Sequence, residues 1–174
     1  MSIGKWVGIG AGWFFGGPIG AIIGYYIGKN FFTGKNDNEK AYEVSLLILA
    51  SLVIKADGKV RKEELNYVKD FFTRTFGQVK SKKYYEIFNT LNKQSLSSKL
   101  RAICLQLTQS INHASRLQII HFLFGVASSD NEIHQTEINV INKIATYLNV
   151  SSQDFQSISA MFVKGGSTLS LIHI

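Results

Sequence analysis

The chain has very little cysteine or proline and few acidic residues, and each shortage limits what it can be. Its 174 residues include 1 Cys and 1 Pro. The lone thiol, Cys104, excludes an internal disulfide and fits a reducing compartment, and its place on an apolar helical face predicts a core residue. The net charge is +7, but no basic helix or aromatic-basic motif accompanies it, so nucleic-acid binding is not expected.

The sequence also lacks the patterns of a catalytic site. His113 and His121 belong to no pair at i, i+4 spacing that would bind zinc. The N-terminal glycines do not form a dinucleotide-binding motif, because Trp13 and Phe15 stand where the last glycine belongs. We therefore expect a protein that is not an enzyme.

The run from Trp6 to Gly28 contains no charged residue. As one helix it would extend roughly 34 Å, and the hydrocarbon core of a bilayer is about 30 Å thick. The run therefore predicts a transmembrane anchor, placed at residues 1–30, that binds membrane lipid. The lysines that follow favour a single-pass protein with a cytoplasmic C-terminal domain: Lys29, Lys35 and Lys40.

Glycine recurs at every fourth position of this run. Small residues four apart let helices approach closely in lipid, which predicts a homodimer or oligomer formed through the anchor. The packing glycines would be Gly8, Gly12, Gly16, Gly20, Gly24 and Gly28. Pro18 predicts a kink, and a full break there would favour a re-entrant hairpin instead. A buried glycine-rich helix or strands in a soluble protein would be a further alternative.

The rest of the chain predicts an all-α domain at 39–163, after a polar linker at 31–38 and before a tail at 164–174. Apolar residues recur at helical spacing, and no stretch alternates with a period of two. Ser151 is expected to cap the last helix, with Asp154 three residues later. About seven helices are expected, at 39–56, 61–76, 81–92, 97–110, 114–128, 134–148 and 151–163.

An internal repeat relates residues 53–65 to residues 126–138. Gly58 matches Asn131, and these are the residue types that best tolerate a left-handed backbone in a turn. The repeat predicts two similar helical hairpins around a pseudo-twofold axis. Val60 and Ile133 are expected to pack beneath the two turns.

Each copy carries an Asp in the turn and a Glu seven residues later. Carboxylate oxygens suit Ca²⁺ or Mg²⁺, so a metal site is one interpretation of these acids. The other is local structure, because acids stabilise helix N-termini and bind turn amides. An EF-hand is excluded, since Lys59 and Arg61 stand where oxygen ligands would be needed. The four acids are Asp57, Glu64, Asp130 and Glu137.

Two sets of residues resemble DjlA-type DnaJ-like co-chaperones. Lys5-Trp6, Gly16-Gly17-Pro18 and the segment from Ile22 to Phe31 resemble their membrane anchor. The domain that follows resembles their TerB-like domain, a fold shared with tellurite-resistance TerB proteins. The residues that carry this second resemblance are Arg116–Ile120, Asp130, Glu137, Leu148–Ser151, Asp154–Phe155 and Met161–Phe162.

The resemblance implies a single-pass inner-membrane protein with dimerising anchors and a C-terminal J domain that stimulates the ATPase of an Hsp70 partner. It also implies metal binding at the four acids of the repeat. Arg61 and His134 depart from the small polar residue usual at the helix start, and Asn131 replaces a glycine.

One part of the family is missing from these residues. They contain no His-Pro-Asp motif, so they are not expected to perform the J-domain step. Residues 169–174 resemble the translation of a sequencing adapter, and we expect the natural reading frame to continue from about Gly166 into a J domain. The leading hypothesis is the anchor and regulatory domain of a membrane co-chaperone. The alternative is a stand-alone membrane-tethered TerB-like module that senses a divalent cation or a stress partner.

Overall fold

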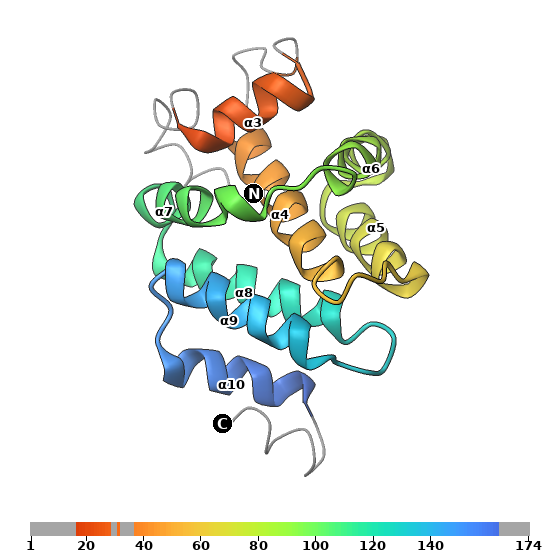
Figure 1. Ribbon diagram of the computed structural model, residues 1–174. Coiled ribbons are helices and arrows are strands. Elements are labelled where there is room, and N and C mark those ends of the chain that lie inside the picture. Colours follow the sequence, from red (N-terminus) through yellow and green to blue (C-terminus); the bar gives the residue numbers. More distant parts are fainter. Residues whose placement is uncertain (1–16, 29–30, 32–36, 164–174) are drawn as a thin grey trace.

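The computed structural model describes residues 17–28, 31 and 37–163, and within these ranges every regular element is a helix (Figure 1). Seven of the α-helices lie between residues 37 and 163. The elements are α3 (Pro18–Tyr26), α4 (Asp37–Ile54), α5 (Lys62–Phe76), α6 (Gln78–Asn92), η3 (Ser97–Lys99), α7 (Leu100–Ser110), α8 (His113–Ala127), α9 (Gln135–Tyr147) and α10 (Ser152–Phe162).

The all-α prediction is confirmed, and each helix expected after residue 38 is present within a few residues of its expected bounds. The helix expected at 97–110 is divided in the structure, because a 3-10 turn precedes α7. Ser151 caps α10 as expected, since its side chain accepts a hydrogen bond from the Asp154 N–H at 3.1 Å. The periodicity of the apolar residues therefore predicted these helices correctly.

The core is built around α4 and α8, which pack against each other. Both helices are apolar on nearly all sides, which is typical of a helix enclosed by others. Helices α6 and α9 pack against α4, and helices α9 and α10 pack against α8 (Figure 1). Cys104 is fully buried in this core, as predicted, and burial raises the pKa of its thiol to about 12.

The interruption expected at Pro18 lies at the start of the described residues. Gly17 is extended, with φ −101° and ψ −176°, and α3 begins at Pro18. A residue before proline avoids the helical region, and proline itself fits the first turn of a helix, so the chain starts a helix here and does not merely kink one. None of the helices in the described part of the chain combines the length and the hydropathy needed to cross a membrane.

Helix α3 packs on the domain through one face. Ile19, Ile22 and Ile23 are buried, and α3 contacts α4 and α7. The Ile19 N–H, which has no partner within the helix, donates to the Gln106 Oε1 atom of α7 at 2.8 Å. The start of α3 is therefore fixed by a residue of the TerB-like domain.

The predicted glycine row falls only partly within the described residues. Gly20 is buried, a Cβ on Gly24 would meet nothing within 4 Å, and Gly28 has φ +112°. The other three packing glycines, Gly8, Gly12 and Gly16, lie outside the described residues, as do the adapter-like residues 169–174.

The expected linker at 31–38 contains one core residue. Phe31 is buried, and the ammonium groups of Lys40 and Lys83 lie 5.5 and 5.3 Å from the centre of its ring. Helix α4 also begins within this range, at Asp37. The connection therefore packs onto the domain at Phe31.

Candidate functional site

The two matched turns lie side by side at one end of the bundle, where α4 leads into α5 and α8 leads into α9 (Figure 1). Gly58 and Asn131 have φ +80° and +66°, so both turns use the left-handed backbone that the repeat predicts. Their N–H groups bond to the carbonyls of matched residues, Lys55 at 3.1 Å and Ser128 at 3.0 Å. The internal repeat is thus present in the fold.

The aspartates of the two turns have equivalent surroundings. Asp57 Oδ1 accepts a hydrogen bond from the Lys59 N–H at 3.0 Å, and Asp130 Oδ1 accepts one from the Glu132 N–H at 3.2 Å. Their Oδ2 atoms both face Arg61, which lies 2.7 Å from Asp57 through Nη2 and 3.3 Å from Asp130 through Nε. A single guanidinium therefore connects the two copies.

The glutamates lie deeper, and both are fully buried. Glu64 Oε1 accepts a hydrogen bond from Arg61 Nη1 at 3.3 Å, while Glu137 Oε1 accepts one from the His134 N–H at 3.1 Å. Each Oε2 atom is buried and receives no hydrogen bond from an N–H or hydroxyl group of the described residues.

The Glu64 and Glu137 carboxyls lie close enough for each to influence the pKa of the other. Burial raises the pKa of both well above the ordinary value of 4.5, and the negative charge of Glu64 raises that of Glu137 further. Burial therefore favours the protonated, uncharged form of these two carboxyls.

The two cationic positions of the repeat differ sharply. Arg61 contacts three carboxylates, and its hydrogen bond lowers the pKa of Asp57. His134, at the matched position, approaches Asp130 Oδ2 at 3.9 Å through Nε2. Among the described residues, this buried Nε2 atom has no hydrogen-bond partner. Positive charge is thus concentrated on the first copy.

The four predicted acids do converge, but the site does not fit a divalent metal ion as it stands. Arg61 lies against three of the four: Asp57, Glu64 and Asp130. Within the described ranges no group of three or more His, Cys, Asp or Glu side chains is arranged to hold a metal. Ca²⁺ or Mg²⁺ binding stays a prediction, and Arg61 is the residue on which it depends.

The apolar residues of the turns follow the prediction in one copy only. Ile133 packs against the core, but Val60 is 48 % exposed. Val60 lies just before Arg61, whose side chain turns inward to the acids. The expectation that Val60 packs beneath its turn is therefore wrong.

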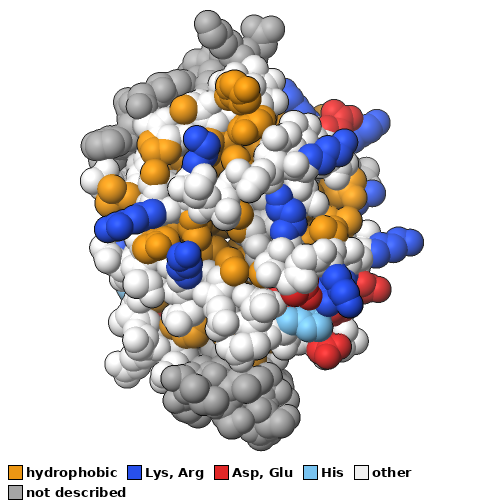
Figure 2. Space-filling view, viewed as in Figure 1, with side chains coloured by type: hydrophobic (Ala, Val, Ile, Leu, Met, Phe, Trp, Pro, Cys, Tyr) orange, Lys and Arg blue, Asp and Glu red, His pale blue; other side chains and the backbone are white. Residues whose placement is uncertain are grey.

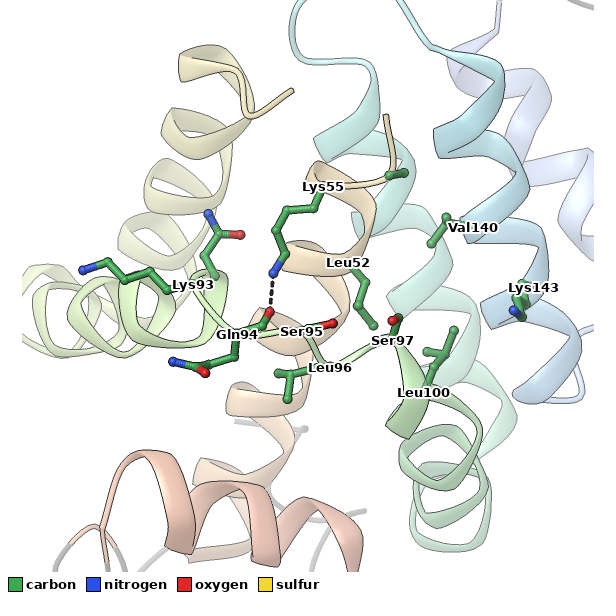
Figure 3. A pocket seen from close by; sticks show the side chains of 12 residues that line it. Leu52, Lys55, Lys93, Gln94, Ser95, Leu96, Ser97, Leu100, Val140 and Lys143 are labelled. Atoms are coloured by element: carbon green, nitrogen blue, oxygen red, sulfur yellow. Dashed lines mark hydrogen bonds between the residues drawn. The ribbon is translucent and has the colours of Figure 1, made fainter. Parts of the chain in front are cut away.

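A cavity of about 530 Å³ lies between α4, α9 and the segment that joins α6 to α7 (Figure 3). Its apolar wall consists of Leu52, Leu96, Leu100 and Val140. Lys55 points into it and donates a hydrogen bond to the carbonyl of Gln94 (Figure 3). Lys93 and Lys143 line its exposed rim, and the buried Asn92 Oδ1 atom receives no hydrogen bond from the part of the chain that the structure describes.

The surface around these sites is unevenly charged. Figure 2 shows hydrophobic and basic side chains interspersed over the face seen in Figure 1, and most of the acidic side chains visible there lie, with a histidine, toward the two turns. Sequence reasoning missed both the cavity and the bridging role of Arg61. Spacing along a helix predicts neighbours within one element, and both features join elements far apart in the chain.

Comparison with known families agrees with this architecture. Residues 43–160 match the family described as "Tellurite resistance protein TerB", and residues 1–37 match the "Co-chaperone DjlA transmembrane domain". No curated protein and no solved structure was found to match. Because the TerB match covers more than half of the 174 residues, the chain belongs to the TerB family, as a membrane-anchored module of DjlA-like type.

Proposed function

We propose that this chain is the membrane tether and regulatory module of a DjlA-type Hsp70 co-chaperone, and that it acts by binding a partner and not by catalysis. The observation that carries this proposal is the succession, in one chain, of a DjlA transmembrane match at 1–37 and a TerB match at 43–160. A J domain joined to this module would recruit Hsp70, and the module would hold that activity at the membrane.

The cavity between α4 and α9 is the best candidate for the partner-binding site. It combines an apolar wall with the ammonium groups of Lys55, Lys93 and Lys143. Such a lining suits an acidic protein segment that also carries apolar side chains, because the lysines attract the carboxylates and the wall buries the apolar groups. The net charge of +7 would attract the same partner from a distance.

The repeat explains why this cavity is open. The pair Leu52 and Val140, which lines it, corresponds in the repeat to Gly125 and Tyr67. There the ring of Tyr67 lies directly against Gly125, so the equivalent space is filled. Val140 leaves room because its side chain is much smaller than a tyrosine ring.

The alternative function is a stand-alone tethered TerB-like module. Its ion-sensing version requires a divalent cation among the four acids, where Arg61 already lies. Its partner-sensing version would use the same cavity. The two functions therefore differ mainly in whether Hsp70 is recruited.

The co-chaperone role can be tested on the product of the intact gene, incorporated into phospholipid vesicles with Hsp70. We expect it to stimulate the Hsp70 ATPase, and we expect deletion of residues 1–36 to release it from floated vesicles while stimulation in solution persists. An intact product that floats with vesicles but leaves the ATPase rate unchanged would favour the stand-alone module.

The cavity can be tested separately with a labelled peptide of alternating Glu and Leu, by fluorescence anisotropy on the full chain in detergent. Lys93→Glu combined with Lys143→Glu should weaken binding at least about tenfold, as should Val140→Tyr. The matched control is Lys62→Glu combined with Lys82→Glu, which changes the net charge equally at exposed positions outside the cavity. Equal binding by all variants would contradict the assignment.

A further inference from the structure

We propose that Arg61 is a built-in cation, which takes the place in this chain that a divalent metal ion would hold between the two acidic turns. Its guanidinium joins the hairpins α4–α5 and α8–α9 by ion pairs, so that this chain needs no metal to hold them together. A TerB-type domain is thereby made independent of the ion that its acids would otherwise bind.

The contacts of Arg61 cover the acids of both copies. Three different nitrogen atoms are used: Nη2 lies 2.7 Å from Asp57, Nη1 lies 3.3 Å from Glu64, and Nε lies 3.3 Å from Asp130. A guanidinium carries five N–H donors in a rigid plane, so it can serve several carboxylates at once. This is the same demand that a metal ion meets with several oxygen ligands.

A metal ion and Arg61 would compete for the same oxygen atoms. Ca²⁺ needs carboxylate oxygens at about 2.3–2.6 Å from a common centre. Asp57 Oδ2 and Asp130 Oδ2 instead point to nitrogens of one guanidinium, and their Oδ1 atoms accept hydrogen bonds from turn N–H groups. A divalent ion at this centre would also lie beside a like charge, which is unfavourable at such short range.

The second copy shows that one cation is enough. His134 has the matched position but makes only the 3.9 Å approach to Asp130. Glu137 Oε1 accepts a hydrogen bond from the His134 N–H, and burial raises the pKa of Glu137, which favours its uncharged form. The second copy therefore makes little demand for a cation beyond Arg61.

This arrangement makes a specific prediction about removing the guanidinium. Arg61→Ala would leave Asp57, Glu64 and Asp130 without a cation between them, and their side chains would then be free to rearrange around a hard divalent ion. The variant should lose stability in the absence of metal and recover it when metal is added, because an ion that binds only the folded state stabilises that state.

The experiment is thermal unfolding of the full chain in detergent, followed by circular dichroism in EDTA and in millimolar CaCl₂ or MgCl₂. We expect the wild-type Tm to be the same in both solutions within about 1 °C. Arg61→Ala should melt lower in EDTA and rise by about 5 °C with CaCl₂, and titration calorimetry should detect Ca²⁺ heat only for this variant. Lys59→Ala, which removes an exposed cation from the same turn, should show no gain with metal.

Three outcomes would contradict the proposal. Ca²⁺ or Mg²⁺ heat from the wild type that disappears in Asp57→Asn with Asp130→Asn would show that the metal site is intact. An Arg61→Ala variant that is unfolded with and without metal, or folded but indifferent to it, would show that no ion can replace the guanidinium. Arg61→Lys keeps a charge but cannot serve three acids, so it should melt below the wild type; an unchanged Tm would show that bridging is unimportant.

Discussion

The turn after α4 and the turn after α8 follow the same backbone path, but the residue that begins the next helix differs between them. In the first turn it is Arg61, which contacts three carboxylates. In the second it is His134, which approaches one at 3.9 Å. Because the acids of both turns converge on one place, a single guanidinium serves the whole pair. Duplication of a fold thus does not require duplication of its charges.

The most direct way to break this comparison is to remove each cationic side chain in turn. Arg61→Ala should lower the free energy of unfolding by about 1–3 kcal/mol, because partly buried carboxylates lose their hydrogen-bond donor. His134→Ala should cost less than about 1 kcal/mol, since its ring makes no short polar contact. Urea unfolding of both variants measures the difference. Equal losses in the free energy of unfolding would mean that Arg61 and His134 stabilise the fold to the same extent.

Helix α8, which precedes the second turn, contains Gly125 at the position where α4 contains Leu52. A Cβ on Gly125 would overlap the hydroxyl of Tyr67, so Gly125→Ala should cost about 1–3 kcal/mol by overpacking. In a Tyr67→Ala background the same change should be neutral or stabilising, because alanine favours a helix over glycine by about 1 kcal/mol. A double-mutant cycle by urea unfolding measures this coupling. The same cost in both backgrounds would show that Tyr67 does not set the requirement for glycine.

The dependence of stability on pH tests the part of the site that the two copies share. Burial raises the pKa of Glu64 and Glu137, so the stability that they contribute is fully present below about pH 4.5 and is lost as the pH rises through their folded values. The free energy of unfolding should therefore fall between about pH 5 and pH 8. Arg61 lowers the pKa of Asp57, whose contribution is lost in the opposite direction, below about pH 4.

A matched pair of variants assigns this slope to the buried carboxyls. Glu137→Gln should flatten the fall between pH 5 and pH 8, because it removes one of the two buried carboxyls whose pKa is raised. Glu86→Gln removes an exposed carboxyl of α6 and should leave the slope unchanged. An unchanged slope in Glu137→Gln would show that other groups set the pH dependence.

How far the sequence predicted the structure also differs between regions. In the TerB-like domain the spacing of apolar residues was enough to predict the helices, because most of them bury one face against a core formed by α4 and α8. The positive φ angles of Gly58 and Asn131 were predictable from residue type. The repeat identified the four acids, but it did not show that the acids of the two copies lie together.

Other features depended on contacts between distant residues. Pro18 indicated an interruption, but it did not indicate that Gln106, which lies 87 residues away, accepts a hydrogen bond from the Ile19 N–H. Glu43 was missed for the same reason. It is buried in α4 because Tyr84 and Lys80 of α6 donate to it at 2.6 and 3.2 Å. An acid among the apolar residues of a buried helix was the available signal.

The smallest expected effect concerns the residues that allow the two turns to share one backbone path. Gly58→Asn should change the free energy of unfolding by less than about 0.5 kcal/mol, because Asn131 already adopts the same conformation at φ +66°. Gly58→Val should cost about 1–2 kcal/mol, since a branched side chain is strained in the left-handed region, although a Cβ there would meet nothing within 4 Å. The space around Gly58 is open, so any loss in the valine variant measures backbone strain alone. If both variants unfolded at the wild-type urea concentration, the turns would not need a left-handed residue, and the likeness of the two hairpins would have to be maintained by their acids.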